Sequence, residues 1–361
     1  MELQNIRRIA VFKMRNIGDV LMITPALRAL REAFPGAKIT VVVNPGTEAM
    51  LAHNPDVDDL LIYPRDAAKE GHPFARLGAE LRFLRELRRH QPDLSVSLTE
   101  GDRAAWSSRL SGARYRAGMG RYRRGVYDPR SRFYNLPTPP LSNDVHEVEK
   151  QFLLLQEAGL VAREKKPGPL CLVVPDDLRR WAREQLDAKR PVVHVHPVSR
   201  WLWKCWTNEA MAEVIDWLQA ERDAQVVVTT GPADRERERA REIVALCRRA
   251  PVFHDGNLSL GQIAALSAEA DLFFGVDTAP MHIAAAVGTP VIALFGPTRI
   301  VSWAPWCEQK QVLSQPCACN ITRKVACDWD KVRACLAAIT PDEAKAACDR
   351  MLFRREAPVT P

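Results

Sequence analysis

The stretch RRIAVFKMRNIGDVLMITPALRAL, residues 7–30, runs from an apolar segment of strand length through a short turn into a segment with helical apolar spacing. This is the layout of a strand–turn–helix unit that binds nucleotides. A dinucleotide site would carry Gly-x-Gly-x-x-Gly in the turn, whereas this turn has a single glycine, Gly18, followed by Asp19. The carboxylate at the helix start is therefore either a helix cap or a group with a chemical role.

The same alternation of strand-length and helical segments continues along the chain. It predicts strands at residues 9–14, 38–44, 59–64, 93–98, 191–197, 224–231, 251–255, 271–276 and 290–297. It predicts helices at residues 24–34, 74–90, 145–160, 208–220, 235–248, 260–268 and 279–287. Such alternation indicates an α/β protein with mostly parallel sheets covered by helices.

The pattern breaks at Pro167-Gly168-Pro169 and then restarts, which indicates two Rossmann-like α/β/α domains joined by a linker. We expect one domain over residues 1–165 and a second over 166–340. Residues 341–361 are expected to form a helix and tail that pack back toward the first domain. Two such domains facing each other would leave a cleft between the carboxyl ends of their sheets, where ligands bind in these folds.

The composition is that of a soluble globular protein, with 47% hydrophobic and 26% charged residues. The sequence has no uninterrupted apolar run of about 18 residues and no apolar signal segment near Met1, so a cytoplasmic location is expected. The net charge of +7 favours acidic partners such as phosphates, an anionic membrane or nucleic acid. Because no nucleic-acid-binding motif accompanies the charge, we expect no nucleic-acid partner.

Nine cysteines in a chain expected to be cytoplasmic indicate thiols rather than a disulfide framework. Four of them cluster in sequence, but their C-x-C-x7-C-x7-C spacing is not a common zinc pattern. A structural metal there remains the alternative for Cys317, Cys319, Cys327 and Cys335.

The segment ADLFFGVDTAPMHIAAAVGTPVIALFGPT, residues 270–298, carries the clearest candidate site. A strand is expected to end at Asp277-Thr278, and Pro280 falls in the first turn of the next helix. Backbone amides from Thr278 to Met281 would then form a seat for a diphosphate. Asp277 either holds a ligand hydroxyl or caps the helix, and His282 either faces the ligand or is a core histidine.

A second segment, HVHPVSRWLWKCWTNEAMAEVI, begins at His194, in the first strand of the second half. Ser199 and Lys204 lie in the loop that follows, and we expect this loop at the same sheet edge as Thr278. Lys204 could neutralise charge on a departing phosphate, or its stem could cover the surface of the neighbouring tryptophans.

Nine arginines with interleaved tyrosines fall between Arg103 and Arg132. This window is either a solvated loop or a grip for a phosphorylated partner, because a guanidinium matches phosphate oxygens. The arginines considered for such a grip are Arg114, Arg116, Arg121, Arg123 and Arg124.

RNIGDVLMITPAL (residues 15–27) and VDTAPMHIAAAVGTPVIALFGPT (residues 276–298) together resemble the ADP-heptose:lipopolysaccharide heptosyltransferases, inverting enzymes of the GT-B fold. HPVSRWLWKCW, residues 196–206, is similar to the heptosyltransferase III branch, which adds the side-chain heptose of the inner core. The likeness extends from Ile9 to Met351. One departure is Ala279, where the family often has glycine.

The resemblance implies that the first domain binds the acceptor and the second binds the nucleotide sugar. Asp19 then matches the general base, with Gly18 giving room beside it, and Lys204 matches the residue near the donor phosphates. The other implied donor-binding positions are Ser199, Asp277, Thr278, Ala279, Pro280, Met281 and His282. Glu236 matches a residue that contacts the adenosine ribose, unless it lies on a solvated helix face.

The chemistry of inverting transfer needs a base on the acceptor hydroxyl and positive potential on the leaving diphosphate, which Asp19 and Lys204 would supply. The chain has no convincing Asp-x-Asp cation motif, so we expect no metal or other cofactor. The implied partners are ADP-heptose and the lipopolysaccharide inner core, with peripheral binding at the inner face of the cytoplasmic membrane. The alternatives are a GT-B transferase for another nucleotide sugar, a sugar-nucleotide epimerase, and a non-catalytic nucleotide-sugar-binding protein at a membrane surface.

Overall fold

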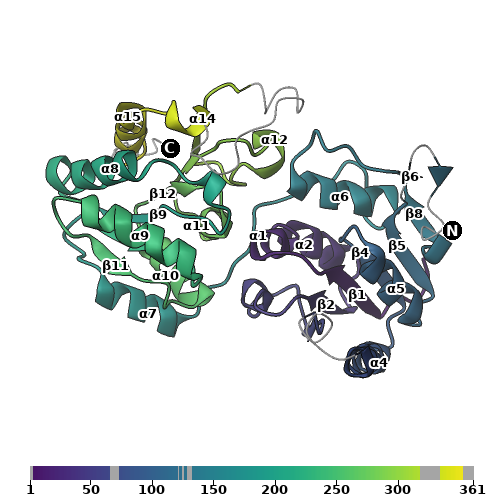
Figure 1. Ribbon diagram of the computed structural model, residues 1–361. Coiled ribbons are helices and arrows are strands. Elements are labelled where there is room, and N and C mark those ends of the chain that lie inside the picture. The colour runs from purple at the N-terminus through teal and green to yellow at the C-terminus, as the bar shows by residue number, and fades with distance from the viewer. Residues whose placement is uncertain are drawn as a thin grey trace, which may run out of the picture. The chain divides into compact units, whose positions relative to one another are not determined.

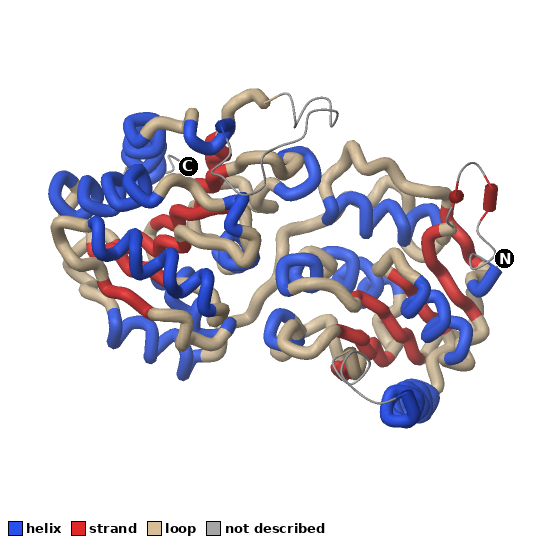
Figure 2. The backbone as a smooth tube through the Cα atoms, in the orientation of Figure 1, coloured by secondary structure: helices blue, strands red, loops and turns tan. Residues whose placement is uncertain are grey.

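The computed structural model describes residues 3–65, 73–120, 122–123, 126–127, 132–317 and 334–352. The chain divides into two compact units, Met1–Leu172 and Val173–Pro361. In each unit the strands form a central sheet with helices packed on it (Figures 1 and 2). The division falls a few residues after the Pro167-Gly168-Pro169 break from which the sequence predicts a linker.

The first unit contains a six-stranded, wholly parallel sheet in the order β3-β2-β1-β4-β5-β8. Its strands are β1 (Arg8–Lys13), β2 (Lys38–Val43), β3 (Asp59–Ile62), β4 (Leu94–Ser97), β5 (Tyr115–Met119) and β8 (Leu136–Thr138), with a separate antiparallel pair, β6 (Tyr122–Arg123) and β7 (Val126–Tyr127). Its helices are α1 (Ile17–Leu21), α2 (Thr24–Ala33), the 3₁₀ turn η1 (Glu48–Met50), α4 (Pro73–Arg89), α5 (Asp102–Leu110) and α6 (Glu147–Glu157).

The second unit repeats this design with a six-stranded parallel sheet in the order β11-β10-β9-β12-β13-β14. Its strands are β9 (Val192–His196), β10 (Gln225–Thr229), β11 (Val252–His254), β12 (Leu272–Val276), β13 (Val291–Leu294) and β14 (Lys310–Leu313). Its helices are α7 (Asp176–Gln185), the 3₁₀ turn η3 (Leu202–Lys204), α8 (Asn208–Glu221), α9 (Asp234–Leu246), α10 (Leu260–Glu269), α11 (Ala279–Ala286), α12 (Ile300–Trp303), α14 (Ala334–Ala337) and α15 (Pro341–Leu352).

Both sheets have the strand order 3-2-1-4-5-6 of the doubly wound nucleotide-binding fold. In that order the chain leaves the first strand toward one side of the sheet and the fourth strand toward the other. The loops after these two strands therefore diverge and leave a crevice at the carboxyl edge. In the first unit these loops follow β1 and β4, and in the second they follow β9 and β12.

The alternation of side chains along β1 assigns its residues to the two faces of the first sheet. Ala10, Phe12 and Met14 pack against Phe83 and Leu87 of α4. The opposite face carries Ile9, Val11 and Lys13, all buried. A charged residue therefore continues an otherwise apolar face at the carboxyl end of the strand.

The structure places the last described helix, α15, in the second unit, where it packs on α8, and the packing of residues 341–361 toward the first domain stays a prediction. Ala344, Ala347 and Cys348 of α15 are fully buried in the core that also contains α8 residues such as Val214 and Leu218. Small residues three and four positions apart let α15 lie close against α8. Residues 353–361 lie outside the described part of the chain.

The strands and helices predicted from periodicity are confirmed, with ends shifted by a few residues. The capping boxes at Ser259/Gln262 and Thr340/Glu343 form, and Gly288 has the positive φ of +85° that ends α11. Strands β5, β8 and β14 were not predicted. Arg116 interrupts the apolar run of β5, and Pro137 interrupts β8, which pairs in the sheet with β5 alone.

Within the described ranges, none of the helices has the length and apolar character needed to cross a membrane. Seven described cysteines are thiols. Cys319 and Cys327 of the sequence cluster lie outside the described residues, and the described part of the chain holds no group of three metal-ligating side chains.

Candidate functional site

Lys204 and Asp277 meet at the crevice of the second sheet. The Lys204 ammonium lies 2.6 Å from Asp277 Oδ2, although the two residues are 73 positions apart. Lys204 ends η3 in the loop after β9, and Asp277 directly follows β12, so the two strands that flank the crevice each supply one partner. The carboxylate is 6% exposed and the ammonium side chain 19% exposed. The two residues predicted for the donor side therefore lie together, and Asp277 holds the Lys204 ammonium at this edge.

The α11 turn begins one residue after Asp277, with Thr278 as the N-cap in extended conformation and without a side-chain cap bond. Pro280 has no N–H, and the Met281 N–H donates to the Thr278 carbonyl at 3.1 Å. Among the described residues, the N–H groups of Thr278 and Ala279 have no backbone acceptor. The amide seat is therefore narrower than the four residues predicted, and Lys204 supplies the positive charge beside it.

The Ser199–Trp206 loop combines structural and exposed groups. Ser199 is buried, its N–H donates to Cys205 Sγ at 3.3 Å, and its hydroxyl accepts from the Trp201 N–H at 3.3 Å. Trp206 is a core residue whose indole N–H donates to the Ile339 carbonyl at 3.1 Å. Lys204 Nζ lies 5.5 Å from the Trp203 ring centroid, so the lysine covers a tryptophan and pairs with Asp277 at once.

Glu236 lies at the start of α9, after β10, and is only 8% exposed. The solvated helix face considered for this residue is therefore wrong. The carboxylate faces Gly231, where a Cβ atom would come within 2.6 Å of Glu236 Oε1, so a larger residue at position 231 would displace the carboxylate. Burial raises the pKa of Glu236, and the Arg200 guanidinium opposes that rise. Glu236 is a buried acceptor group at the same carboxyl edge.

A layer of buried histidines supports this edge and was not singled out from the sequence. His194 donates to or accepts from Ser267 Oγ at 2.8 Å, and Thr229 Oγ1 lies 2.7 Å from His194 Nε2 and 2.8 Å from His196 Nδ1. Burial lowers the pKa of both histidines to about 3, so both are neutral at pH 7. His282 is also buried, within α11. The layer fixes the strand ends from which the site loops depart.

Asp19 lies in α1 of the first unit, at the third helical position, with Asn16 as the N-cap. The interpretation of Asp19 as the N-cap is therefore wrong. Gly18 precedes Asp19 and is buried in α1. It therefore belongs to the first unit, whereas the other predicted donor-binding residues belong to the second.

Lys13 is the functional candidate that sequence reasoning missed in the first unit. It ends β1 and is 1% exposed, and its ammonium donates to the Leu98 carbonyl at 3.1 Å and lies 3.4 Å from Glu147 Oε1. A buried charge of this kind is costly unless it is paired and hydrogen-bonded. Leu98 follows β4 and Glu147 begins α6, so the pair sits at the crevice of the first sheet. The signal in the sequence was the lone lysine that ends an apolar strand.

Burial raises the pKa of Asp19 above its usual range, and this effect outweighs the others. Lys13 lowers that pKa, Glu147 raises it, and Arg15 and a hydrogen bond with the Asn16 backbone lower it. A helix start favours an ionised carboxylate, but at Asp19 burial has the larger effect. The pKa of this carboxyl is set by burial and by the Lys13–Glu147 pair.

Arg114 and Arg116 are the arginines of the predicted grip whose side chains the structure describes. Arg116 is half-buried and donates to the carbonyls of Phe133, at 2.7 Å, and Ala113, at 2.8 Å, which indicates a structural role. Arg114 is exposed over the Tyr115 ring, at 5.1 Å from its centroid. Arg121, Arg124 and the side chain of Arg123 lie outside the described residues.

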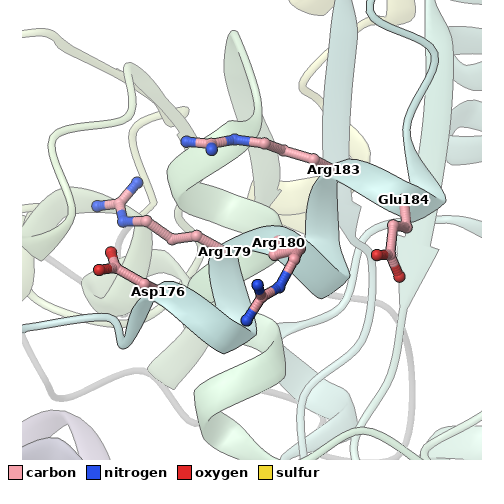
Figure 3. Close-up of a pocket in the computed structure, with 5 residues that line it drawn as sticks. All are labelled: Asp176, Arg179, Arg180, Arg183 and Glu184. Atoms are coloured by element: carbon pink, nitrogen blue, oxygen red, sulfur yellow. The ribbon is translucent and has the colours of Figure 1, made fainter.

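A cavity of about 430 Å³ opens on α7 and is lined by Asp176, Arg179, Arg180, Arg183 and Glu184 (Figure 3). Arg179 and Arg183 both pair with Glu269, at 2.9 and 2.8 Å. The Glu269 carboxylate therefore already compensates two of the cations that line the cavity. None of the predicted site residues lines it. We therefore place no substrate in this cavity.

Comparison with known proteins agrees with the geometry. The sequence model of glycosyltransferase family 9 (heptosyltransferase) matches residues 80–333. The chain is 33% identical over 301 residues to lipopolysaccharide heptosyltransferase 3 of Escherichia coli K12, covering 82% of this chain and 84% of that protein. It is 30% identical over 300 residues to lipopolysaccharide heptosyltransferase 1 of Pseudomonas aeruginosa, covering 81% and 79%.

Solved structures share the fold. Escherichia coli ADP-heptose lipopolysaccharide heptosyltransferase II matches with a TM-score of 0.78 at 21% identity, over 97% of this chain and all (100%) of that one. Escherichia coli heptosyltransferase WaaC with ADP matches with a TM-score of 0.75 at 21% identity, over 95% and 99%. The two Rossmann-like units therefore have the GT-B fold of these structures.

The family match spans well over half of the chain, and the relatives align along most of their own length. The chain belongs to glycosyltransferase family 9, the heptosyltransferases.

Proposed function

We propose that this enzyme transfers a heptose from ADP-heptose to the inner core of lipopolysaccharide, with inversion at the anomeric carbon. The observation that carries the proposal is the Lys204–Asp277 pair beside the α11 turn, in a chain one-third identical to lipopolysaccharide heptosyltransferase 3. Cells lacking the protein should make a core that is one heptose short by mass spectrometry. A core with its full heptose content in such cells would contradict the proposal.

The second unit binds the donor in this proposal. The ammonium of Lys204 and the N–H groups of Thr278 and Ala279 hold the diphosphate, while Glu236 accepts from the ribose hydroxyls. Asp277 uses one of the three ammonium protons of Lys204 and leaves two for phosphate oxygens. Ser199, Pro280, Met281 and His282 shape the pocket around these groups.

The first unit supplies the base. Asp19 takes the proton of the acceptor hydroxyl while that oxygen bonds to the anomeric carbon. The bond from that carbon to the diphosphate breaks, and ADP leaves with the electron pair. The positive charge of Lys204 stabilises the leaving group as its charge grows, which is where such groups lower the barrier most.

Donor binding in this proposal is selective for ADP and needs no divalent cation. The support is Lys204, a fixed cation at the place where a metal ion would otherwise neutralise the diphosphate. Isothermal titration calorimetry should give the same ADP affinity with magnesium and with a chelator. Binding of UDP equal to or tighter than that of ADP would indicate another nucleotide sugar as donor.

The acceptor carries anionic groups that Arg114 contacts in this proposal. Arg114→Glu should raise the acceptor KM by roughly tenfold and weaken its dependence on salt, with ADP affinity unchanged, because a charge-assisted hydrogen bond is lost. Arg163→Glu is the matched control, since Arg163 is an exposed arginine of the same unit. Equal acceptor kinetics in both variants would indicate that the arginine-rich segment between Arg103 and Arg132 is a solvated surface without a role in acceptor binding.

We also propose that the enzyme works as a peripheral protein at the inner face of the cytoplasmic membrane. The support is the lipid-linked acceptor of the named relatives and the net charge of +7.

A further inference from the structure

Helix α4 of the first unit has an outer face that is unusual for a surface helix. Phe74, Leu77 and Leu81 are 80%, 57% and 51% exposed, although all three are large and apolar. They follow one another at intervals of three and four residues, so they form one stripe along the helix. An exposed apolar stripe of this size indicates a partner that excludes water.

The stripe lies opposite the face that holds α4 on its sheet. Ala79, Phe83 and Leu87 are at most 5% exposed and are spaced four residues apart. Phe83 comes nine residues after Phe74, which is two and a half helical turns and therefore the opposite side. The apolar stripe is thus additional to the core-facing residues, and α4 is a peripheral helix of its unit in Figure 1.

The same helix is strongly basic. Its exposed arginines are Arg76, Arg82, Arg85, Arg88 and Arg89, against two glutamates. Arg85 lies three helical turns after Phe74, and Arg88 lies two turns after Leu81. Both arginines are therefore on the side of α4 that carries the apolar stripe, nearer the carboxyl end of the helix. The glutamates are engaged: Glu80 accepts from the Tyr63 hydroxyl, and Glu86 pairs with Arg89 at 2.8 Å.

We propose that α4 docks this face onto an anionic phospholipid bilayer, with the apolar stripe among the acyl chains and Arg82, Arg85 and Arg88 on the headgroup phosphates. A basic amphipathic helix lies in the interface plane in this way. A second copy of the chain fits less well, because a contact between two α4 helices would place two strongly basic faces together, with five exposed arginines and two glutamates on each.

The inference deepens the proposed function by naming the surface that meets the membrane. The amino end of α4 follows the β3 connection, so Phe74 and Leu77 lie toward the carboxyl edge of the first sheet, where α1 carries Asp19. Docking through α4 would therefore bring that edge near the headgroups, where a lipid-linked acceptor presents its sugars.

The test is sedimentation of the full chain with vesicles of phosphatidylethanolamine and phosphatidylglycerol, compared with phosphatidylcholine alone. Phe74→Ser/Leu77→Ser/Leu81→Ser and Arg82→Glu/Arg85→Glu should each weaken binding to the anionic vesicles by roughly tenfold or more. The matched controls are Leu246→Ser, an apolar side chain 49% exposed in the second unit, and Arg163→Glu/Arg180→Glu, with the same change of charge. The controls should bind as the unchanged protein does.

Equal binding of the α4 variants and the controls would overturn the inference, as would equal binding to both vesicle types. A dimer that dissociates when the apolar stripe is changed, without vesicle binding, would assign the face to a protein contact instead. Turnover of a soluble, deacylated core acceptor should be unchanged in both α4 variants. Absence of that turnover in the unchanged protein would count against the proposed function and not against the membrane surface.

Discussion

Asp19→Asn is expected to lower kcat by roughly 10²-fold to 10⁴-fold, the contribution of a general base. Asparagine keeps the shape of the side chain and can accept from the Asn16 backbone, but it cannot take the acceptor proton. Because burial raises the pKa of Asp19, the ionised carboxylate is disfavoured in the fold at neutral pH. The variant should therefore have an unchanged or slightly higher Tm and an unchanged affinity for ADP.

The pH profile gives this prediction a sign. The base must be ionised, so kcat falls as the pH drops through the pKa of Asp19, and this limb lies above that of an exposed aspartate. Lys13 lowers that pKa and Glu147 raises it. Lys13→Met should move the limb to higher pH and Glu147→Gln should move it to lower pH, while Arg15, which also faces Asp19, is left in place.

The matched control for Asp19 is Asp93→Asn. Asp93 accepts from the N–H groups of Arg7 and Arg8 at 2.8 and 2.9 Å, at the amino end of β1 and thus far along the strand from Asp19. Its replacement should cost stability and leave kcat unchanged. Retained turnover in Asp19→Asn, or limbs that do not move in opposite directions, would require another base.

Lys204→Met is expected to lower kcat by roughly 10²-fold to 10³-fold, the usual loss when one group that stabilises a leaving anion is removed. The same change should abolish most of the preference for ADP over adenosine in a binding titration, since the ammonium contacts the phosphates and not the base. The variant leaves Asp277 buried without its cation, so Lys204→Met/Asp277→Asn separates loss of stability from loss of chemistry.

Lys345→Met serves as the control for Lys204. Lys345 belongs to the same unit, is likewise 19% exposed, and pairs with Glu213 at the same distance of 2.6 Å. Its loss should leave kcat and the ADP preference unchanged. If the Lys204→Met enzyme matches the Lys345→Met enzyme in both measurements, Lys204 has a packing role in the Ser199–Trp206 loop and does not act on the leaving group.

The fold was predictable because apolar segments of strand length alternate with helical spacing throughout both units. The crevices follow from this order, so Lys204 and Asp277 could be assigned to one edge before their contact was known. Strands β5 and β8 were not predictable, since Pro137 interrupts β8 and Arg116 interrupts β5, where its guanidinium donates to backbone carbonyls. Local hydropathy does not encode such tertiary bonds.

The sequence predicted which residues belong to the site, but it did not predict their burial or the charged groups around them. Asp19 was recognised, but its pKa depends on Glu147, which begins a helix 128 residues later. Lys13 was missed because a lone lysine in a strand usually faces solvent. In the structure Lys13 is only 1% exposed. The outer face of α4 was missed because its apolar residues merge with the core-facing ones in a single helical pattern.

The central claim is that this chain moves one heptose from ADP-heptose to the lipopolysaccharide core, and mass spectrometry tests it most directly. Core acceptor from cells that lack the protein is incubated with ADP-heptose and the purified enzyme, without divalent cation. We predict a product heavier by one heptose with the unchanged enzyme and none with Asp19→Asn. An acceptor of unchanged mass with the unchanged enzyme, or a product formed from a UDP-sugar in preference to ADP-heptose, would contradict it.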